Sequence, residues 1–148
     1  MKKLFIAALF LVGCVSPSTL MVNREGQGMR CASTGWGTGG VLAATASHSS
    51  CVSDFNKLGY VKLPDVWLGV TPTDWKGPVI AKEVEGPAMT AGIQVSDQFL
   101  SIDGKPITTY LDTFKALNGK SVGDKVKVIV KRDGHELSFE PVLAVRGE

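Results

Sequence analysis

The chain has 148 residues, a length that fits one ordinary domain and a small appendage. It is 44% hydrophobic and 20% charged, which excludes a disordered tail and a polytopic membrane protein. Its 16 Lys and Arg against 14 Asp and Glu leave a net charge of +2, too small for a nucleic-acid-binding surface. The three cysteines form an odd count, so the sequence must account for each of them.

The first 14 residues contain a basic head, a short apolar run and a cysteine. The sequence MKK is a basic head, and the apolar run over 4–12 is too short to cross a bilayer as a helix, which takes roughly 20 residues. The run ends on LVGC at 11–14, which resembles the lipobox of bacterial lipoproteins, where the signal peptide is cut before an acylated cysteine. This resemblance implies a signal peptide over 1–13 and lipid attachment at Cys14, with an ordinary secretory signal as the alternative. Val15 stands where an aspartate favours the inner membrane, so the outer membrane is expected.

Residues 14–30 are expected to be a short tether leaving the membrane, because they include the Ser/Pro-rich stretch at 16–19. Residues 31–66 follow as a glycine-rich loop and a short helix. The stretch 31–40 has too many glycines for a helix or strand, and it lacks the Gly-Lys-Ser/Thr ending of a phosphate-binding loop. Apolar residues then recur at helical spacing, which predicts an amphipathic helix ending near Leu58, before Gly59. They are Cys51, Val52, Phe55 and Leu58.

The remaining cysteines, Cys31 and Cys51, are predicted to form a disulfide, because an exported protein folds in an oxidising compartment. Free thiols are the alternative. No metal is expected, because neither His48 nor His135 stands at ligand spacing with two cysteines. His48 is interpreted as a solvated side chain on a polar helix face, since no nucleophile-elbow sequence accompanies it.

From residue 66 to 143 the pattern changes to short strands separated by turn signals. It predicts an α+β fold that is mainly β: a partly open barrel of five or six short strands with two helices. Asp103-Gly104 and Asp133-Gly134 are tight-turn signals. Strands are expected over 67–70, 78–84, 98–102, 125–131 and 136–143, with a helical turn over 88–91 and a helix over 110–117.

Several short motifs follow one another in a specific order in this region. They are Trp67-Leu68-Gly69-Val70, Gly86-Pro87-Ala88, Ala91-Gly92-Ile93, Ile102-Asp103-Gly104-Lys105-Pro106-Ile107, Val122-Gly123-Asp124 and Arg132-Asp133-Gly134. The ordered set resembles a bacterial PDZ domain of the type that follows the protease domain in the Deg/HtrA family. The resemblance covers 67–143 and leaves 144–148 as a C-terminal tail.

The resemblance implies a peptide-binding groove. In such a groove an extended peptide adds to a strand edge opposite a helix, and N–H groups of the preceding loop bind its terminal carboxylate. By resemblance, residues 67–70 form that loop and strand start, and a Cβ at Gly69 would crowd the ligand. The helix over 110–117 is the opposing wall, although apolar residues at this spacing, such as Phe114 and Leu117, are more often part of the core. The candidate peptide-binding residues are Trp67, Leu68, Gly69, Val70, Tyr110, Thr113, Phe114 and Leu117.

The resemblance therefore implies a binding module: a lipid-anchored protein of the bacterial cell envelope that faces the periplasm and captures C-termini or extended segments of proteins. No enzyme is expected, because only about 50 residues lie between Cys14 and Trp67 and no Gly-Asn-Ser-Gly-Gly-like nucleophile segment occurs. No cofactor, metal or nucleic acid is expected. Two alternatives stay open. One is a structural protein whose groove is filled by Val61, Leu63 and Val66, and the other is a non-catalytic adaptor to an envelope protease.

Overall fold

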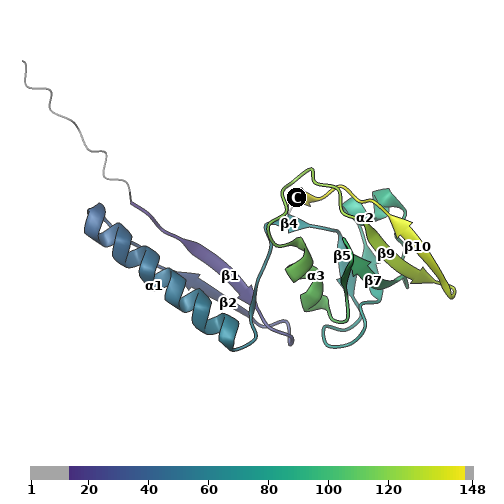
Figure 1. Cartoon of the computed structure of the whole chain (residues 1–148), viewed down its shortest axis with the longest axis horizontal. Helices are drawn as coiled ribbons and strands as arrows, with labels where there is room; N and C mark the ends of the chain where they lie inside the picture. Colours follow the sequence, from purple (N-terminus) through teal and green to yellow (C-terminus); the bar gives the residue numbers. More distant parts are fainter. Residues whose placement is uncertain (1–13, 146–148) are drawn as a thin grey trace, which may run out of the picture.

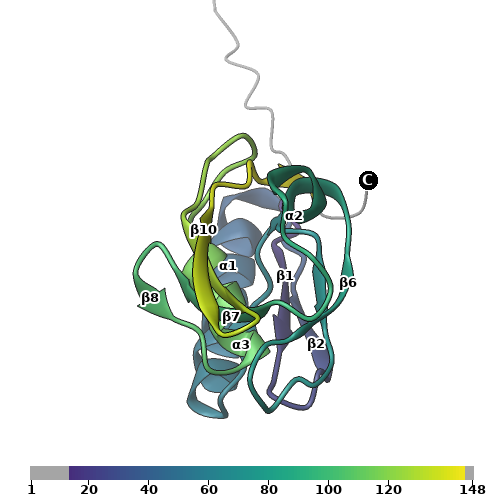
Figure 2. The ribbon, with the colours of Figure 1, turned by 90° about the vertical axis from the view of Figure 1, so that its right-hand side faces the viewer.

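The computed structural model describes residues 14–145, so the expected signal peptide over 1–13 and the last three residues of the tail lie outside the described residues. Figure 1 shows an elongated molecule made of two parts that follow each other along its long axis. The N-terminal part is a small sheet covered by one long helix. The C-terminal part is mainly β with two shorter helices, and Figure 2 shows it along the long axis.

The N-terminal part contains four elements, whose strands lie in the order β2-β1-β3 with antiparallel pairing. The predicted disulfide between Cys31 and Cys51 is confirmed, and it joins β2 to α1. The bonded cysteines are 20 residues apart, and closing a loop of that size contributes on the order of 3 kcal/mol. The elements are β1 (Ser18–Val22), β2 (Gly28–Ala32), α1 (Gly37–Lys57) and β3 (Val61–Lys62).

The expectation of an irregular glycine-rich loop was wrong. Ala32 ends β2, and residues 37–40 form the first turn of α1, so the helix is much longer than the short one expected. First-turn N–H groups have no helical partner in any case, and each glycine there costs about 1 kcal/mol relative to alanine. Gly35 has a packing role, because a Cβ on it would collide with the carbonyl oxygen of Gly40. The glycines thus allow β2 to turn tightly into α1.

Two further expectations for this part were wrong. The segment 14–30 is not a tether, because it contains β1 and the start of β2, and Val15 already pairs with Gly35. His48 is half-buried rather than solvated, and together with Thr19 of β1 it lines a hollow beside α1. The segment is ordered because β1 pairs with β2 and packs against α1, both of which follow it in the chain.

The C-terminal part confirms the predicted mainly β, PDZ-like fold with two helices. It contains a four-stranded sheet in the order β10-β9-β7-β8 and two strand pairs, β5-β6 and β11-β4. Three of its strands have only two residues each, and this explains why more strands occur than the five or six expected. The elements are β4 (Val66–Trp67), β5 (Val70–Pro72), β6 (Ala81–Val84), α2 (Gly86–Ala91), β7 (Gln98–Ile102), β8 (Lys105–Pro106), α3 (Tyr110–Leu117), β9 (Val128–Arg132), β10 (His135–Phe139) and β11 (Ala144–Val145).

The core of this part lies between the sheets and α3. Val126, Val128 and Val130 are fully buried, which confirms the period of two in that segment. Phe99 and Ile102 of β7 lie in the same cluster. The N-terminal part contributes to this core through Val22, and Val61 and Leu63 pack against it.

A buried ion pair fastens α2 to β9. The carboxylate of Asp97, which is fully buried, accepts hydrogen bonds from Nε and Nη2 of Arg132 at 2.6 Å each and from the N–H of Gln94 at 2.9 Å. Arg132 also donates to the carbonyl oxygen of Gly92, at the C-cap of α2, at 3.0 Å. Burial by itself raises the pKa of Asp97, but the bonds from Arg132 and Gln94 outweigh it and hold that pKa below its ordinary value of 3.8.

Replacing Asp97 with asparagine should lower the free energy of unfolding by about 3 kcal/mol at pH 7, because the partly exposed guanidinium of Arg132 loses its buried charge partner. The pKa of Asp97 is lower in the folded than in the unfolded chain. Its stabilisation is therefore complete above about pH 5 and is lost as the pH falls through the folded pKa. Urea denaturation at several pH values measures both effects. An equally steep loss of stability on acidification in Asp97→Asn and the unsubstituted protein would contradict the assignment.

Candidate peptide-binding site

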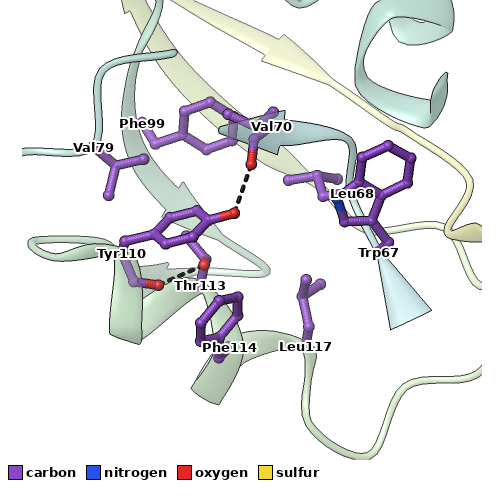
Figure 3. Close-up of a pocket in the computed structure, with 9 residues that line it drawn as sticks. All are labelled: Trp67, Leu68, Val70, Val79, Phe99, Tyr110, Thr113, Phe114 and Leu117. Carbon is purple, nitrogen blue, oxygen red and sulfur yellow. Dashed lines mark hydrogen bonds between the residues drawn. The ribbon is translucent and has the colours of Figure 1, made fainter. Parts of the chain in front are cut away.

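A small apolar cavity lies between β5 and α3 (Figure 3). Seven of the eight residues expected to bind a peptide line it, and Gly69, the eighth, lies between Leu68 and Val70 in the loop above it. Val79 and Phe99, from the two neighbouring predicted strands, complete the lining and were not expected. The seven are Trp67, Leu68, Val70, Tyr110, Thr113, Phe114 and Leu117.

The loop that precedes β5 is held from behind by its carbonyl groups. The oxygen of Leu68 accepts from the N–H of Ala88 at 2.9 Å, and the oxygen of Gly69 accepts from the N–H of Glu85 at 2.8 Å. Both donors belong to the first turn and N-cap of α2. The N–H groups of Leu68 and Gly69 donate to no acceptor within residues 14–145. Successive free N–H groups of this kind form a concavity that binds anions.

One edge of β5 faces α3 and the other pairs with β6. Gly69 bonds toward β6 through Glu85, and Thr73 does so through Ile80, so the intervening Val70 and Pro72 point to the opposite side. The carbonyl oxygen of Val70 accepts a hydrogen bond of 2.6 Å from the hydroxyl of Tyr110, the first residue of α3. Within residues 14–145, β5 pairs with no strand other than β6.

The alternative in which the segment before Trp67 fills the groove is therefore wrong. Val61 pairs with Val22 of β1, and the N–H of Leu63 donates to the oxygen of Leu20. Val66 pairs with Val145 in the β11-β4 pair. The first residues of the segment form β3, which pairs with β1 of the N-terminal sheet and not with β5.

The bond between Tyr110 and Val70 closes the cavity. About 10 Å³ remains inside, which is room for a single water molecule and far below the roughly 300 Å³ of an open ligand pocket. The hydroxyl of Thr113 donates to the carbonyl oxygen of Tyr110 at 2.6 Å, within α3. In Figure 3 the bond from Tyr110 to Val70 crosses the cavity from α3 to β5, and the bond from Thr113 lies along α3.

The start of α3 is held by a capping box between Thr109 and Asp112. Burial raises the pKa of Asp112, but hydrogen bonds from Thr108, Lys115 and Thr109 outweigh it and hold that pKa far below its usual range. The carboxylate therefore stays charged at physiological pH. It keeps the first turn of α3, and with it Tyr110, in place opposite β5.

Comparison with known proteins identifies the family. Residues 66–142, just over half of the chain, match the family model of the PDZ domain. The chain belongs to the PDZ family. Its curated relatives include a protein of Brucella suis named as a zinc metalloprotease, 32% identical over 89 residues. They also include a protein of Ectopseudomonas mendocina named as a DegP-like periplasmic serine endoprotease, 41% identical over 73 residues.

These relatives are much longer proteins. The matches cover 60% and 49% of this chain but only 23% and 15% of the two relatives. This chain therefore spans less than a quarter of the length of either relative. Among solved structures, the HtrA-type protease AlgW with a tripeptide aligns with 99% of this chain and 57% of its own, at a TM-score of 0.52 and 13% identity. That likeness concerns the fold alone.

The glycine of the PDZ loop is required by the fold itself. Gly69 has a φ of +88°, and a Cβ on it would collide with the carbonyl oxygen of Glu85. The expectation that a side chain here would first crowd the ligand is therefore corrected, because the backbone behind the loop is closer. A bulky substitution at Gly69 disturbs the attachment of the loop to α2 before it reaches a ligand.

Trp75 packs against the closed groove from outside, and it was not among the residues expected to belong to the site. Its ring packs edge-on against Tyr110, with centroids 4.9 Å apart, and against Phe114 at 5.9 Å. On its other side it lies against Gly26, in the turn between β1 and β2, and the adjacent Lys76 pairs with Glu25 at 3.6 Å. An aromatic residue inside a polar Pro- and Gly-containing loop was the available signal. The N-terminal part thus touches the groove through this loop.

The described residues hold no group of three or more His, Cys, Asp or Glu side chains suited to a metal ion. Within the same range, none of the helices has the length and apolar character needed to cross a bilayer.

Gly69→Ala should destabilise the PDZ domain more than Gly104→Ala does. Both glycines have a left-handed φ, +88° and +75°, but the space around Gly104 is open. We expect a loss of about 1 kcal/mol for Gly104→Ala, from the backbone conformation alone, and about 2 kcal/mol more for Gly69→Ala, from the added collision. Urea denaturation compares the two variants. Equal losses would show that the contact with Glu85 is relaxed without cost.

Proposed function

We propose that this protein is a peptide-binding module of the bacterial cell envelope that captures protein C-termini by strand addition to β5. The observation that carries the proposal is the pair of free N–H groups at Leu68 and Gly69, at the head of a strand edge that no other described strand covers. A carboxylate bound there would continue into a chain lying along β5. The periplasmic name of one relative and the tripeptide bound to AlgW support the proposal.

The chemistry of the cavity favours an apolar last residue. Below the free N–H groups the walls are Leu68, Val70, Val79, Phe99 and Phe114, all of which are buried side chains without charge. The hydroxyls of Tyr110 and Thr113, which also line the cavity, already donate to backbone oxygens, so a charged or amide side chain would lose more hydration there than it regains in hydrogen bonds. The preferred ligands are therefore peptides that end in a residue such as valine, leucine or phenylalanine.

Pro72 limits the number of backbone hydrogen bonds that a ligand can form with β5. A strand that adds to this edge exchanges hydrogen bonds with Val70 and then with Pro72, two residues later. Pro72 accepts through its oxygen but has no N–H to donate. The ladder is therefore weakened beyond its first pair, and most of the binding energy comes from the terminal carboxylate and the last side chain.

We also propose that Cys14 carries the lipid anchor and that the protein is held at the outer membrane, facing the periplasm. Cys14 is exposed and is not part of the disulfide. The ordered ladder begins at the next residue, so an acyl group on Cys14 would not disturb the fold. More than one acyl chain is needed for stable anchoring, which is the outcome of lipoprotein modification at such a cysteine.

Screening a library of peptides with free C-termini should select apolar last residues, and amidation of the best peptide should weaken its binding at least tenfold. The amide removes the negative charge that the free N–H groups of Leu68 and Gly69 bind. Fluorescence anisotropy of the labelled peptide and of its amide measures the difference. Equal affinity for acid and amide would overturn the carboxylate site.

Tyr110→Phe should raise the affinity for such a peptide about fivefold, with Tyr60→Phe as the matched control. An added strand needs the carbonyl oxygen of Val70 as an acceptor, and the hydroxyl of Tyr110 now occupies it. Breaking a hydrogen bond of this kind costs about 1 kcal/mol, and ligand binding to the phenylalanine variant does not include that cost. The same anisotropy titration applies. Unchanged or weaker binding by Tyr110→Phe would show that the closed cavity does not oppose the ligand.

A further inference from the structure

The pairing of β1 with β2 continues in one register to the first described residues. Ser18 pairs with Ala32, and Val15 pairs with Gly35 in the same alignment. The N–H of Gly35 donates to the oxygen of Val15 at 3.0 Å, and the N–H of Val15 donates to the oxygen of Gly35 at 3.2 Å. The next position in this register sets Cys14 opposite Trp36, and Cα atoms that face each other in this way lie about 4.5–5.5 Å apart.

Trp36 is strongly exposed, although tryptophan is normally among the more buried residues. Its exposed fraction is 77%, and that of Leu42, one and a half turns into α1, is 73%. Val15, which pairs with Gly35 next to Trp36, is 38% exposed. Three apolar side chains are therefore turned to the outside at the end of the molecule where Cys14 lies.

This end of the molecule also lacks charge. No Asp, Glu, Lys or Arg occurs from Cys14 to Asn23 or from Cys31 to Ser53. Figure 1 shows the start of β1 and of α1 at one end of the long axis and the PDZ domain at the other. The charged residues of the N-terminal part lie in the turn and second strand of the hairpin and at the far end of α1. They are Arg24, Glu25, Arg30, Asp54 and Lys57, and Lys62 of β3 follows them in the chain.

We propose that this end, formed by Val15, Trp36 and Leu42 and called the footing, rests in the headgroup region of the membrane that holds Cys14. The inference builds on the proposed lipid attachment at Cys14. Tryptophan favours the boundary between headgroups and acyl chains, where its ring is shielded and its N–H remains hydrated. The uncharged surface around it enters that region without the cost of dehydrating ions.

The anchor makes this weak contact effective. One indole and one leucine bind a bilayer poorly by themselves, but an acyl chain on the residue facing Trp36 keeps the footing at the surface, so the contact becomes intramolecular. α1 then leads away from the membrane, and its 21 residues span about 31 Å. The footing thus fixes the direction in which the PDZ domain is presented.

The test uses the full chain expressed in bacteria, purified from membranes and reconstituted into phosphatidylethanolamine–phosphatidylglycerol vesicles with bromine near the top of the acyl chains. Bromine quenches tryptophan fluorescence only at short range. We expect clear quenching in the unsubstituted protein and at least a fivefold smaller effect in Trp36→Ala, whose remaining tryptophans, Trp67 and Trp75, belong to the PDZ domain.

Leu42 and Leu58 provide matched reporter positions, because their exposed fractions are 73% and 72%. They lie 16 residues apart along and just beyond α1, a distance of about 24 Å. In the Trp36→Ala background, Leu42→Trp should restore quenching and Leu58→Trp should not. Equal quenching of the two reporters, or full quenching in Trp36→Ala, would overturn the footing.

Flotation of the same vesicles separates this inference from the lipid anchor on which it rests. The unsubstituted protein should float with the vesicles, and Cys14→Ser should not. Flotation that depends on Cys14, together with no quenching at residue 36, would leave the anchor standing and reject the footing. Loss of flotation in the unsubstituted protein would reject the anchor and the footing together.

Discussion

The attachment of the loop before β5 to the start of α2 determines the rest of the site. The carbonyl groups of Leu68 and Gly69 are bonded behind the loop, and for that reason their N–H groups are presented to the groove in front. α2 is in turn fixed at its other end by Arg132, which bonds Gly92 and the buried Asp97. The ion pair is therefore a support of the anion site, although it lies outside the groove. Its strength decides how accurately the N–H groups are aimed.

The residues of the groove are in place, but the cavity between β5 and α3 is closed. Its acceptor at Val70 is satisfied by Tyr110, and Trp75 packs on Tyr110 from the outside. A closed state of this kind keeps water and non-specific ligands out of an apolar cavity. Every ligand must first displace an internal hydrogen bond, which costs about 1 kcal/mol. Only ligands that also provide a carboxylate for the loop recover that loss. Closure thus adds to selectivity while lowering affinity.

The sequence predicted most of the PDZ domain because its signals are local. Each of these signals depends only on residues that are close in sequence. Examples are the alternation at Val126, Val128 and Val130, the turn at Asp133-Gly134 and the glycine at position 69. What it missed depends on distant partners. The glycines before α1 are acceptable because the helix covers a sheet, and the segment at 18–22 becomes a strand because β2 and β3 flank it. Likewise, neither the contact of Trp75 with Tyr110 nor the bond from Tyr110 to Val70 leaves a periodic trace.

The N-terminal part has a consequence for the way a ligand is met. A flexible linker of about 50 residues would let the groove move over about 40 Å relative to the point of attachment at Cys14. A sheet and a 21-residue helix joined by a disulfide act instead as a strut of fixed length. Under the proposed lipid attachment at Cys14, such a strut would hold the groove in a thin layer at one distance from the membrane, and it would enrich tails that end in that layer. The disulfide between Cys31 and Cys51 would then help to fix the distance of the groove from the membrane, besides stabilising the fold.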